Sequence, residues 1–121
     1  MELTYEQQCR LYKLRREWFS IDNELEKNDL PLITYGLCKT KRFVPSLVTT
    51  TWRGRKAAKK LPATVKLDYF LSEGTTNFKK IRKYLNKLKP EEFPKYLTAS
   101  YELEVIPLLI NMTYERIKDK C

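Results

Sequence analysis

Histidine is absent from this chain of 121 residues, and glycine occurs only three times. Without histidine the chain lacks the commonest general base and a frequent ligand of zinc and iron. The three glycines form neither a Gly-x-x-x-x-Gly-Lys nor a Gly-x-Gly-x-x-Gly motif, so no phosphate-cradling loop for nucleotide hydrolysis is indicated. We therefore expect no enzymatic activity, no cofactor and no metal site.

Cysteine is also scarce, with single residues at Cys9, Cys38 and Cys121 and no Cys-x-x-Cys pair. Such an odd and scattered set predicts neither a disulfide framework nor a zinc site, and it favours a reducing compartment. The N-terminus shows no apolar core of a signal peptide, which agrees with a cytoplasmic or nuclear location. The longest apolar stretch, residues 105–112, is far shorter than the ~20 residues that cross a bilayer, so no membrane partner is expected.

The remaining composition is that of a folded protein, with 42% hydrophobic and 32% charged residues. A chain of this length can bury one ordinary core without help from metals or disulfides. No repeat, low-complexity run or linker divides it. We expect a single domain over residues 1–121.

The clearest local signal is a capping box at the N-terminus, where Thr4 is followed three residues later by Gln7. Apolar residues then recur at spacings of three and four, which predicts one long helix running to about Lys27. They are Leu11, Leu14, Trp18, Ile21 and Leu25.

The middle of the chain is richer in β-branched and aromatic residues, which predicts a small antiparallel sheet. Residues 32–38 and 43–51 are expected to pair as a hairpin around a polar turn at 39–42, with Pro45 keeping the second strand at an edge. Alternating apolar residues predict a third strand over residues 63–71.

Two further helices are expected toward the C-terminus. Apolar residues from Phe78 to Leu88 line one face of a helix over residues 76–89, and the opposite face is basic. Residues 98–118 predict a buried helix kinked near Pro107, with a strand over 101–106 and a helix starting at Pro107 as the alternative. The expected fold is therefore α+β, with a long N-terminal helix, a small sheet, a basic helix and a buried C-terminal helix.

The charge of +9 is concentrated in the middle of the chain. Residues 30–90 contain 15 basic and two acidic residues, and residues 30–67 contain nine basic residues and no carboxylate. Like charges at this density repel one another, so an external polyanion is the simplest partner for them. A phosphate backbone has the required charge.

Two segments carry this expected interface, namely residues 49–56 and the basic helix over residues 76–89. Residues 49–56 combine three threonine hydroxyls, which could donate to phosphate oxygens, with Trp52 and two arginines. Trp52 could stack on an unpaired base, although core or rim packing is the commoner role of a lone tryptophan. The candidate nucleic-acid-binding residues are Lys39, Lys41, Arg42, Trp52, Arg53, Arg55, Lys56, Lys59, Lys60, Lys79, Lys80, Lys83 and Lys87.

These patterns predict a small basic protein that binds RNA or DNA, alone or within a ribonucleoprotein. The alternative is a protein-interaction module, such as a small viral or phage-type inhibitor, whose basic face meets an acidic partner. A magnesium-dependent nuclease would need clustered carboxylates. Asp68 and Glu73 are the only acidic residues that border the basic segment, so a nuclease is the least favoured of these three functions.

Overall fold

The computed structural model describes residues 2–15, 17–20, 28–72 and 77–120. Within these residues, α-helices accompany a small antiparallel sheet of three strands, so the expected α+β class is confirmed. The chain divides into two compact units, Met1–Val65 and Lys66–Cys121, and each buries apolar side chains of its own. The expectation of a single domain stays a prediction.

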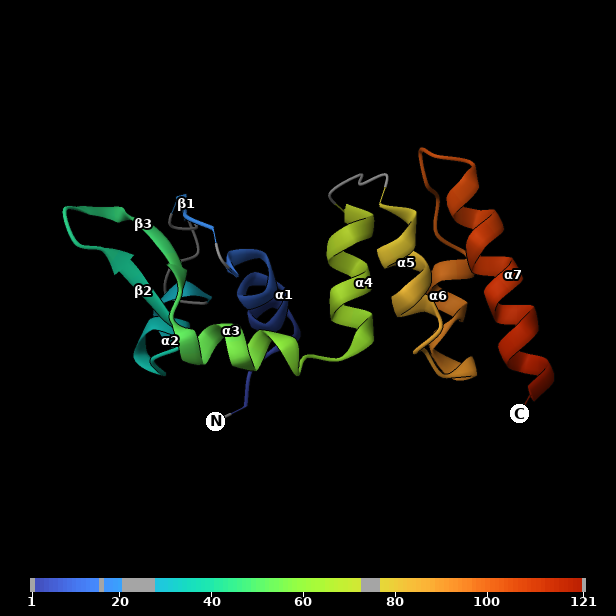
Figure 1. The fold of residues 1–121 in the computed structure, drawn as a ribbon, viewed down its shortest axis with the longest axis horizontal. Helices are drawn as coiled ribbons and strands as arrows, with labels where there is room; N and C mark the ends of the chain where they lie inside the picture. Colours follow the sequence, from blue (N-terminus) through green and yellow to red (C-terminus); the bar gives the residue numbers. More distant parts are fainter. Residues whose placement is uncertain (1, 16, 21–27, 73–76, 121) are drawn as a thin grey trace. The chain divides into compact units, whose positions relative to one another are not determined.

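Unit 1 combines three helices with the sheet (Figure 1). Along the chain its elements are α1 (Tyr5–Leu14), β1 (Phe19–Ser20), α2 (Asp29–Thr34), β2 (Cys38–Lys41), β3 (Val44–Thr50) and α3 (Trp52–Lys59). Strand β3 is central, and β1 and β2 pair with it in antiparallel orientation on either side. The β2–β3 hairpin extends away from α1 and α3.

Helix α1 begins as expected but ends early. The Thr4–Gln7 capping box is present, and Leu11 and Leu14 are fully buried. The prediction that the helix continues to about Lys27 is wrong, because α1 ends at Leu14. The carbonyl of Leu14 accepts hydrogen bonds from hydroxyls of β3, and the chain then pairs with β3 as β1. Trp18 consequently leaves the helix, while the expected apolar positions Ile21 and Leu25 lie outside the described residues.

The hairpin is confirmed, but its boundaries differ from the prediction. Residues 29–34 form α2, where Pro31 stands in the first turn and its missing N–H needs no partner. Strand β2 therefore begins only at Cys38, and residues 39–41, expected as a turn, belong to the strand. The turn itself consists of Arg42 and Phe43.

Pro45 was expected to keep its strand at an edge, and this is wrong because β3 is the central strand. The register explains how a central strand accepts a proline. Thr40 lies opposite Val48, but Lys41 already lies opposite Val44, so residues 45–47 form an irregularity that interrupts the ladder. A proline within a bulge removes no ladder hydrogen bond.

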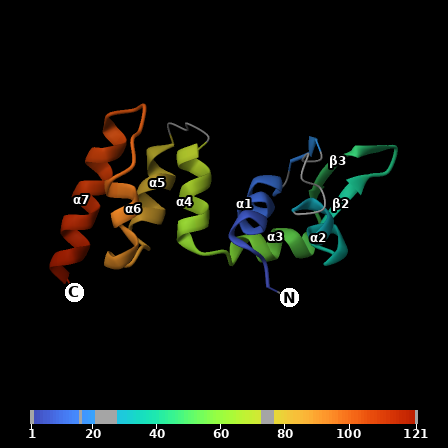
Figure 2. The same ribbon diagram turned by 180° about the vertical axis from the view of Figure 1, so that it is seen from behind.

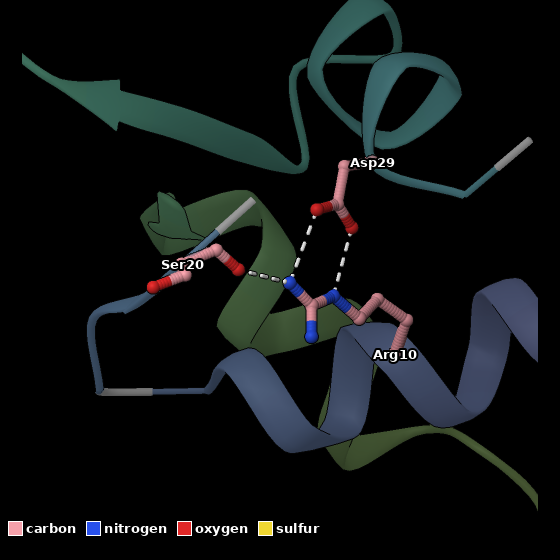
Figure 3. Close-up of polar contacts among 3 residues, drawn as sticks. All are labelled: Arg10, Ser20 and Asp29. Atoms are coloured by element: carbon pink, nitrogen blue, oxygen red, sulfur yellow. Dashed lines mark hydrogen bonds and ion pairs between the residues drawn. The ribbon is translucent and has the colours of Figure 1, made fainter. Parts of the chain in front are cut away.

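A buried ion pair joins three elements of unit 1 (Figure 3). The guanidinium of Arg10 in α1 donates to both carboxylate oxygens of Asp29 in α2, at 2.8 and 3.0 Å. The Nη2 atom of Arg10 also donates to the carbonyl of Ser20 in β1, at 2.9 Å. The Asp29 side chain has no exposed surface, so this contact fixes α2 and β1 against α1.

Unit 2 is helical in the part that the structure describes. Its elements are most of α4 (Ala63–Ser72), then α5 (Phe78–Leu85), the 3-10 helix η1 (Pro90–Glu92), α6 (Pro94–Leu97) and α7 (Val105–Lys120). Helix α7 contacts both α5 and α6. Figure 1 and Figure 2 show the helices of this unit from opposite sides. The core between the helices includes Leu67, Ile81, Leu85, Phe93 and Ile110.

The strand predicted over residues 63–71 is wrong, since these residues form α4. The apolar residues of this segment fit two periods. Val65, Leu67, Tyr69 and Leu71 alternate, which suggested a strand. Leu67, Phe70 and Leu71 also recur at the helical spacings of three and four. Burial selects the helix, because Leu67 and Phe70 are buried and the ring of Phe70 stacks on Tyr84 of α5, with centroids 5.8 Å apart.

Helix α5 confirms the basic amphipathic helix, although it is shorter than expected and ends at Leu85. The side chain of Asn77 caps its first turn, and the expected core positions Ile81, Leu85 and Leu88 are buried. Thr76, the expected start, lies outside the described residues.

Helix α7 corrects the C-terminal prediction. It begins at Val105 rather than near residue 98, so Pro107 falls in the first turn and no kink is needed. The alternative strand over 101–106 is also wrong. The helix is buried on one face only, because Leu108 and Met112 are 62% and 70% exposed.

Candidate functional site

Unit 1 contains a hollow of about 500 Å³ whose lining is strongly cationic. Three of the lining side chains carry a positive charge, and none carries a carboxylate. We call it the cationic hollow. It is lined by Gly36, Lys39, Thr51, Trp52, Arg53 and Arg55. Four predicted site residues that are up to 16 positions apart in the sequence therefore meet at one place.

The hollow forms where α3 begins against the segment between α2 and β2. Thr51 caps α3 by accepting the N–H of Gly54, at 3.2 Å. Its hydroxyl donates to the carbonyl of Gly36, at 2.7 Å, and its own N–H donates to the carbonyl of Leu37, at 3.0 Å. These bonds hold the first turn of α3, which bears Arg53, beside β2, which bears Lys39.

Two glycines make this close approach possible. A Cβ atom on Gly54 would lie 1.9 Å from the carbonyl oxygen of Leu37, so no side chain fits there. Gly36 has a φ of +76°, a conformation that glycine adopts without strain. The nearest side-chain atom to a Cβ at Gly36 would be Nη1 of Arg53, at 4.0 Å, which places that guanidinium over the glycine.

The expected role of the three threonine hydroxyls is wrong. Thr49 donates to the carbonyls of Leu14 and Glu17, and Thr50 donates to that of Leu14. Thr51 donates to Gly36 as described above. Because these hydroxyl protons are used within the fold, any anion in the hollow would be held by the lysine and arginine side chains.

Trp52 lies at the surface rather than in the core. Its side chain is 61% exposed, which departs from the rim-packing role that is commoner for a lone tryptophan. The Cζ atom of Arg53 lies 5.9 Å from the ring centroid, and the Nζ atom of Lys56 lies 5.4 Å from it. The ring is thus an exposed plane with two cations beside it.

The remaining cations of the predicted site in unit 1 lie on the hairpin and on α3. Lys41 and Arg42 are exposed at the end of the β2–β3 hairpin. Lys59 and Lys60 are exposed at the C-terminal end of α3, and they are not among the residues that line the hollow. The structure therefore brings together part of the predicted site of unit 1.

The predicted lysines of unit 2 form the basic face of α5 and the turn after it. Lys79, Lys83 and Lys87 are exposed, and Lys80 is half-buried. The Nζ atoms of Lys83 and Lys87 lie 5.7 and 5.9 Å from the ring centroid of Tyr84, so their charges remain near that ring. A row of lysines on a helix is also common solvated surface.

The carboxylates considered for metal binding have other roles or no description. Asp68 accepts hydrogen bonds from the Tyr96 hydroxyl, at 2.6 Å, and from Lys95 Nζ, at 3.0 Å. Burial, together with the hydrogen bond to Asp68, raises the pKa of the Tyr96 hydroxyl. Glu73 lies outside the described residues. Across residues 2–15, 17–20, 28–72 and 77–120, no three His, Cys, Asp or Glu side chains gather as metal ligands.

None of the helices in the described part of the chain is both long enough and apolar enough to span a bilayer. Comparison with protein-family models, with curated proteins and with solved structures gives no match. We therefore infer a function from the residues of the site.

Gly36 lines the cationic hollow and Phe43 lies in the hairpin turn, but no sequence pattern marks either of them as part of a site. A glycine just before a run of cations is a weak signal, since it acquires meaning only from the close approach of α3. Phe43 was assigned to a strand, and its place in the turn follows from the register of the hairpin.

Cys38 offers a test of how tightly β2 packs. Its thiol is 3% exposed, and burial, with a smaller contribution from the Asp29 charge, raises its pKa from 9.0 to about 12. We expect iodoacetamide to label Cys38 at least ~30-fold more slowly in the native chain than in urea, because few thiolates form and access is closed. Peptide-resolved mass spectrometry measures this, with Cys9 as the half-buried reference. Equal native and denatured rates would contradict this packing.

Proposed function

We propose that this chain binds nucleic acid and that the cationic hollow contacts its phosphate groups. The observation that carries the proposal is the meeting of Lys39, Arg53 and Arg55 around one hollow that no carboxylate lines. Clustered cations raise the local concentration of anions and strengthen phosphate contacts. Arginine forks also match the oxygens of a phosphate group in two-point hydrogen bonds.

The ion pairs that the structure describes support this reading. They join Arg10 to Asp29, Lys95 to Asp68 and Lys118 to Glu115, and none of them involves a cation of the hollow. Among the described residues no carboxylate lines the hollow, and neighbouring cations repel one another, which costs stability unless an anion binds. A polyanion removes that repulsion, and a phosphate backbone can also contact the hairpin and the α3 lysines beyond the hollow.

The salt dependence of binding tests the proposal. If five or more phosphates are neutralised, a plot of log K against log salt for duplex DNA should have a slope of about −4 or steeper. Arg53→Gln with Arg55→Gln should lower affinity about tenfold or more and make the slope shallower by about one per lost contact. The matched control is Lys89→Gln with Lys118→Gln, which removes the same charge from exposed positions of unit 2.

Fluorescence anisotropy with labelled oligonucleotides of single-stranded and duplex form gives these slopes. A slope near zero, or equal losses for the two double variants, would falsify the assignment of binding to the hollow. Absence of saturable binding to every oligonucleotide would overturn the proposed function itself.

The second candidate, a protein-interaction module, is favoured by a different feature. Val105, Leu108 and Met112 form an exposed apolar stripe on α7 at spacings of three and four. Isolated exposed apolar residues are ordinary, but a stripe on one helix face is a common docking element. A chain that ignores all oligonucleotides, yet forms a stable complex that Leu108→Asp abolishes, would support this alternative.

We also propose a reducing compartment, the cytoplasm or the nucleus, for this chain. Cys9 and Cys38 are thiols, and the wide spacing of the cysteines suits no disulfide framework.

A further inference from the structure

The end of the β2–β3 hairpin presents an aromatic ring to solvent. Phe43 is 85% exposed, the largest exposed fraction among the large apolar residues described. It occupies the two-residue turn with Arg42, whose Cζ atom lies 5.2 Å from the ring centroid. Exposing a phenylalanine forgoes the favourable free energy of burying its ring, so a ring kept at the end of a projecting hairpin suggests a contact made there.

The same pairing of an exposed ring with a cation recurs elsewhere in unit 1. Trp52 is 61% exposed, with Arg53 and Lys56 beside it. Trp18 is 41% exposed, and Lys41 Nζ lies 5.7 Å from its ring centroid.

In unit 2, by contrast, the described lysines lie near rings that are buried or, for Tyr114 beside Lys118, half-buried. Tyr84 and Tyr96 are 6% and 3% exposed, so little of either ring is available to a ligand. Exposed rings with adjacent cations are therefore a feature of unit 1.

This combination matches the chemistry of an unpaired nucleotide. A base in a duplex is stacked on both faces, whereas a base in a single strand has faces that an aromatic side chain can cover. The phosphate beside that base is then within reach of the cation next to the ring. Base stacking is tolerant of sequence, because every base has an aromatic face.

We propose that Phe43 and Trp52 are stacking platforms for unpaired bases, so that the ligand of this chain is single-stranded RNA or DNA rather than duplex. The inference rests on the proposed function and adds Phe43, at the hairpin end, to the binding surface. Strand β3 connects the two platforms, and its seven residues extend about 20 Å at ~3.4 Å per residue. A single nucleic-acid strand that contacts both platforms must therefore contain several nucleotides.

The test compares a single strand of roughly 12 nucleotides with a duplex of the same sequence, as DNA and as RNA, at one salt concentration. We expect the wild type to bind the single strand at least tenfold more tightly. Phe43→Ala should lower single-strand affinity roughly tenfold and leave duplex affinity unchanged, because only an unpaired base covers the ring. Phe43→Tyr should restore binding, whereas Phe43→Leu should not, since leucine keeps apolar area without a flat ring.

Two controls make the comparison specific. Leu108→Ala removes a similarly exposed apolar side chain from α7 and should change neither affinity. Trp18→Phe leaves Trp52 as the single tryptophan of the chain, and its fluorescence should be quenched when a single strand binds.

The outcomes separate this inference from the proposed function. If the duplex binds as tightly as the single strand with a steep salt slope, the single-strand inference is overturned and phosphate binding by the hollow remains. If the single strand is preferred but Phe43→Ala has no effect, the assignment of Phe43 is wrong. If Phe43→Ala weakens duplex binding instead, the ring acts as a wedge between paired bases, which also contradicts stacking on unpaired ones.

Discussion

Replacing Asp29 by asparagine is expected to lower the free energy of unfolding by about 3 to 5 kcal/mol. Asp29 has no exposed side-chain surface, and both of its carboxylate oxygens accept hydrogen bonds from Arg10. The variant leaves the guanidinium of Arg10, whose side chain is 12% exposed, without its opposite charge. An uncompensated buried charge is far more costly than the pair is stabilising.

A double replacement distinguishes that charge effect from lost packing. Arg10→Met with Asp29→Leu removes both charges at similar volume, and we expect it to recover most of the lost stability. Urea unfolding followed by tryptophan fluorescence measures the difference, because Trp18 and Trp52 both lie in unit 1. A loss in the double variant as large as that of Asp29→Asn would show that hydrogen-bond geometry, rather than the unpaired charge, is responsible.

Gly54→Ala is the variant for which local and tertiary effects have opposite signs. By helix propensity alone, alanine in α3 would stabilise the chain by about 1 kcal/mol. The added Cβ, however, would lie 1.9 Å from the carbonyl oxygen of Leu37 and 3.0 Å from the Cβ of Thr50. Because these are a backbone group and a buried residue, we expect a net loss of roughly 1–3 kcal/mol or more.

The same substitution should also weaken nucleic-acid binding, since α3 must move away from the segment that carries Gly36 and Lys39. Ala57→Gly is the matched control in the same helix. It should lose about 0.5–1 kcal/mol through propensity and keep its affinity. Urea unfolding and anisotropy titration measure both properties. An increase in stability for Gly54→Ala would contradict the close packing of α3 on the Leu37 carbonyl.

The residue types of the candidate site can be predicted from the sequence, but their arrangement in space cannot. The excess of cations in residues 30–67 and the tryptophan among them are properties of composition, so they can be read before folding. The sequence does not show that Lys39 and Arg53 line one hollow, because the bonds of Thr51 to Gly36 and Leu37 hold the start of α3 beside the start of β2. It likewise does not show that the threonine hydroxyls are already used by backbone carbonyls.

For the helices and strands too, some features were determined by the sequence alone and others by tertiary contacts. The caps at Thr4 and Asn77 and the apolar face of α5 depend on residues three or four positions apart, so the sequence alone determined them. The end of α1, the helical state of residues 63–72 and the position of Pro45 in a central strand were decided by tertiary structure. In each of these cases contacts with residues distant in the sequence selected a conformation other than the one that the local pattern predicted.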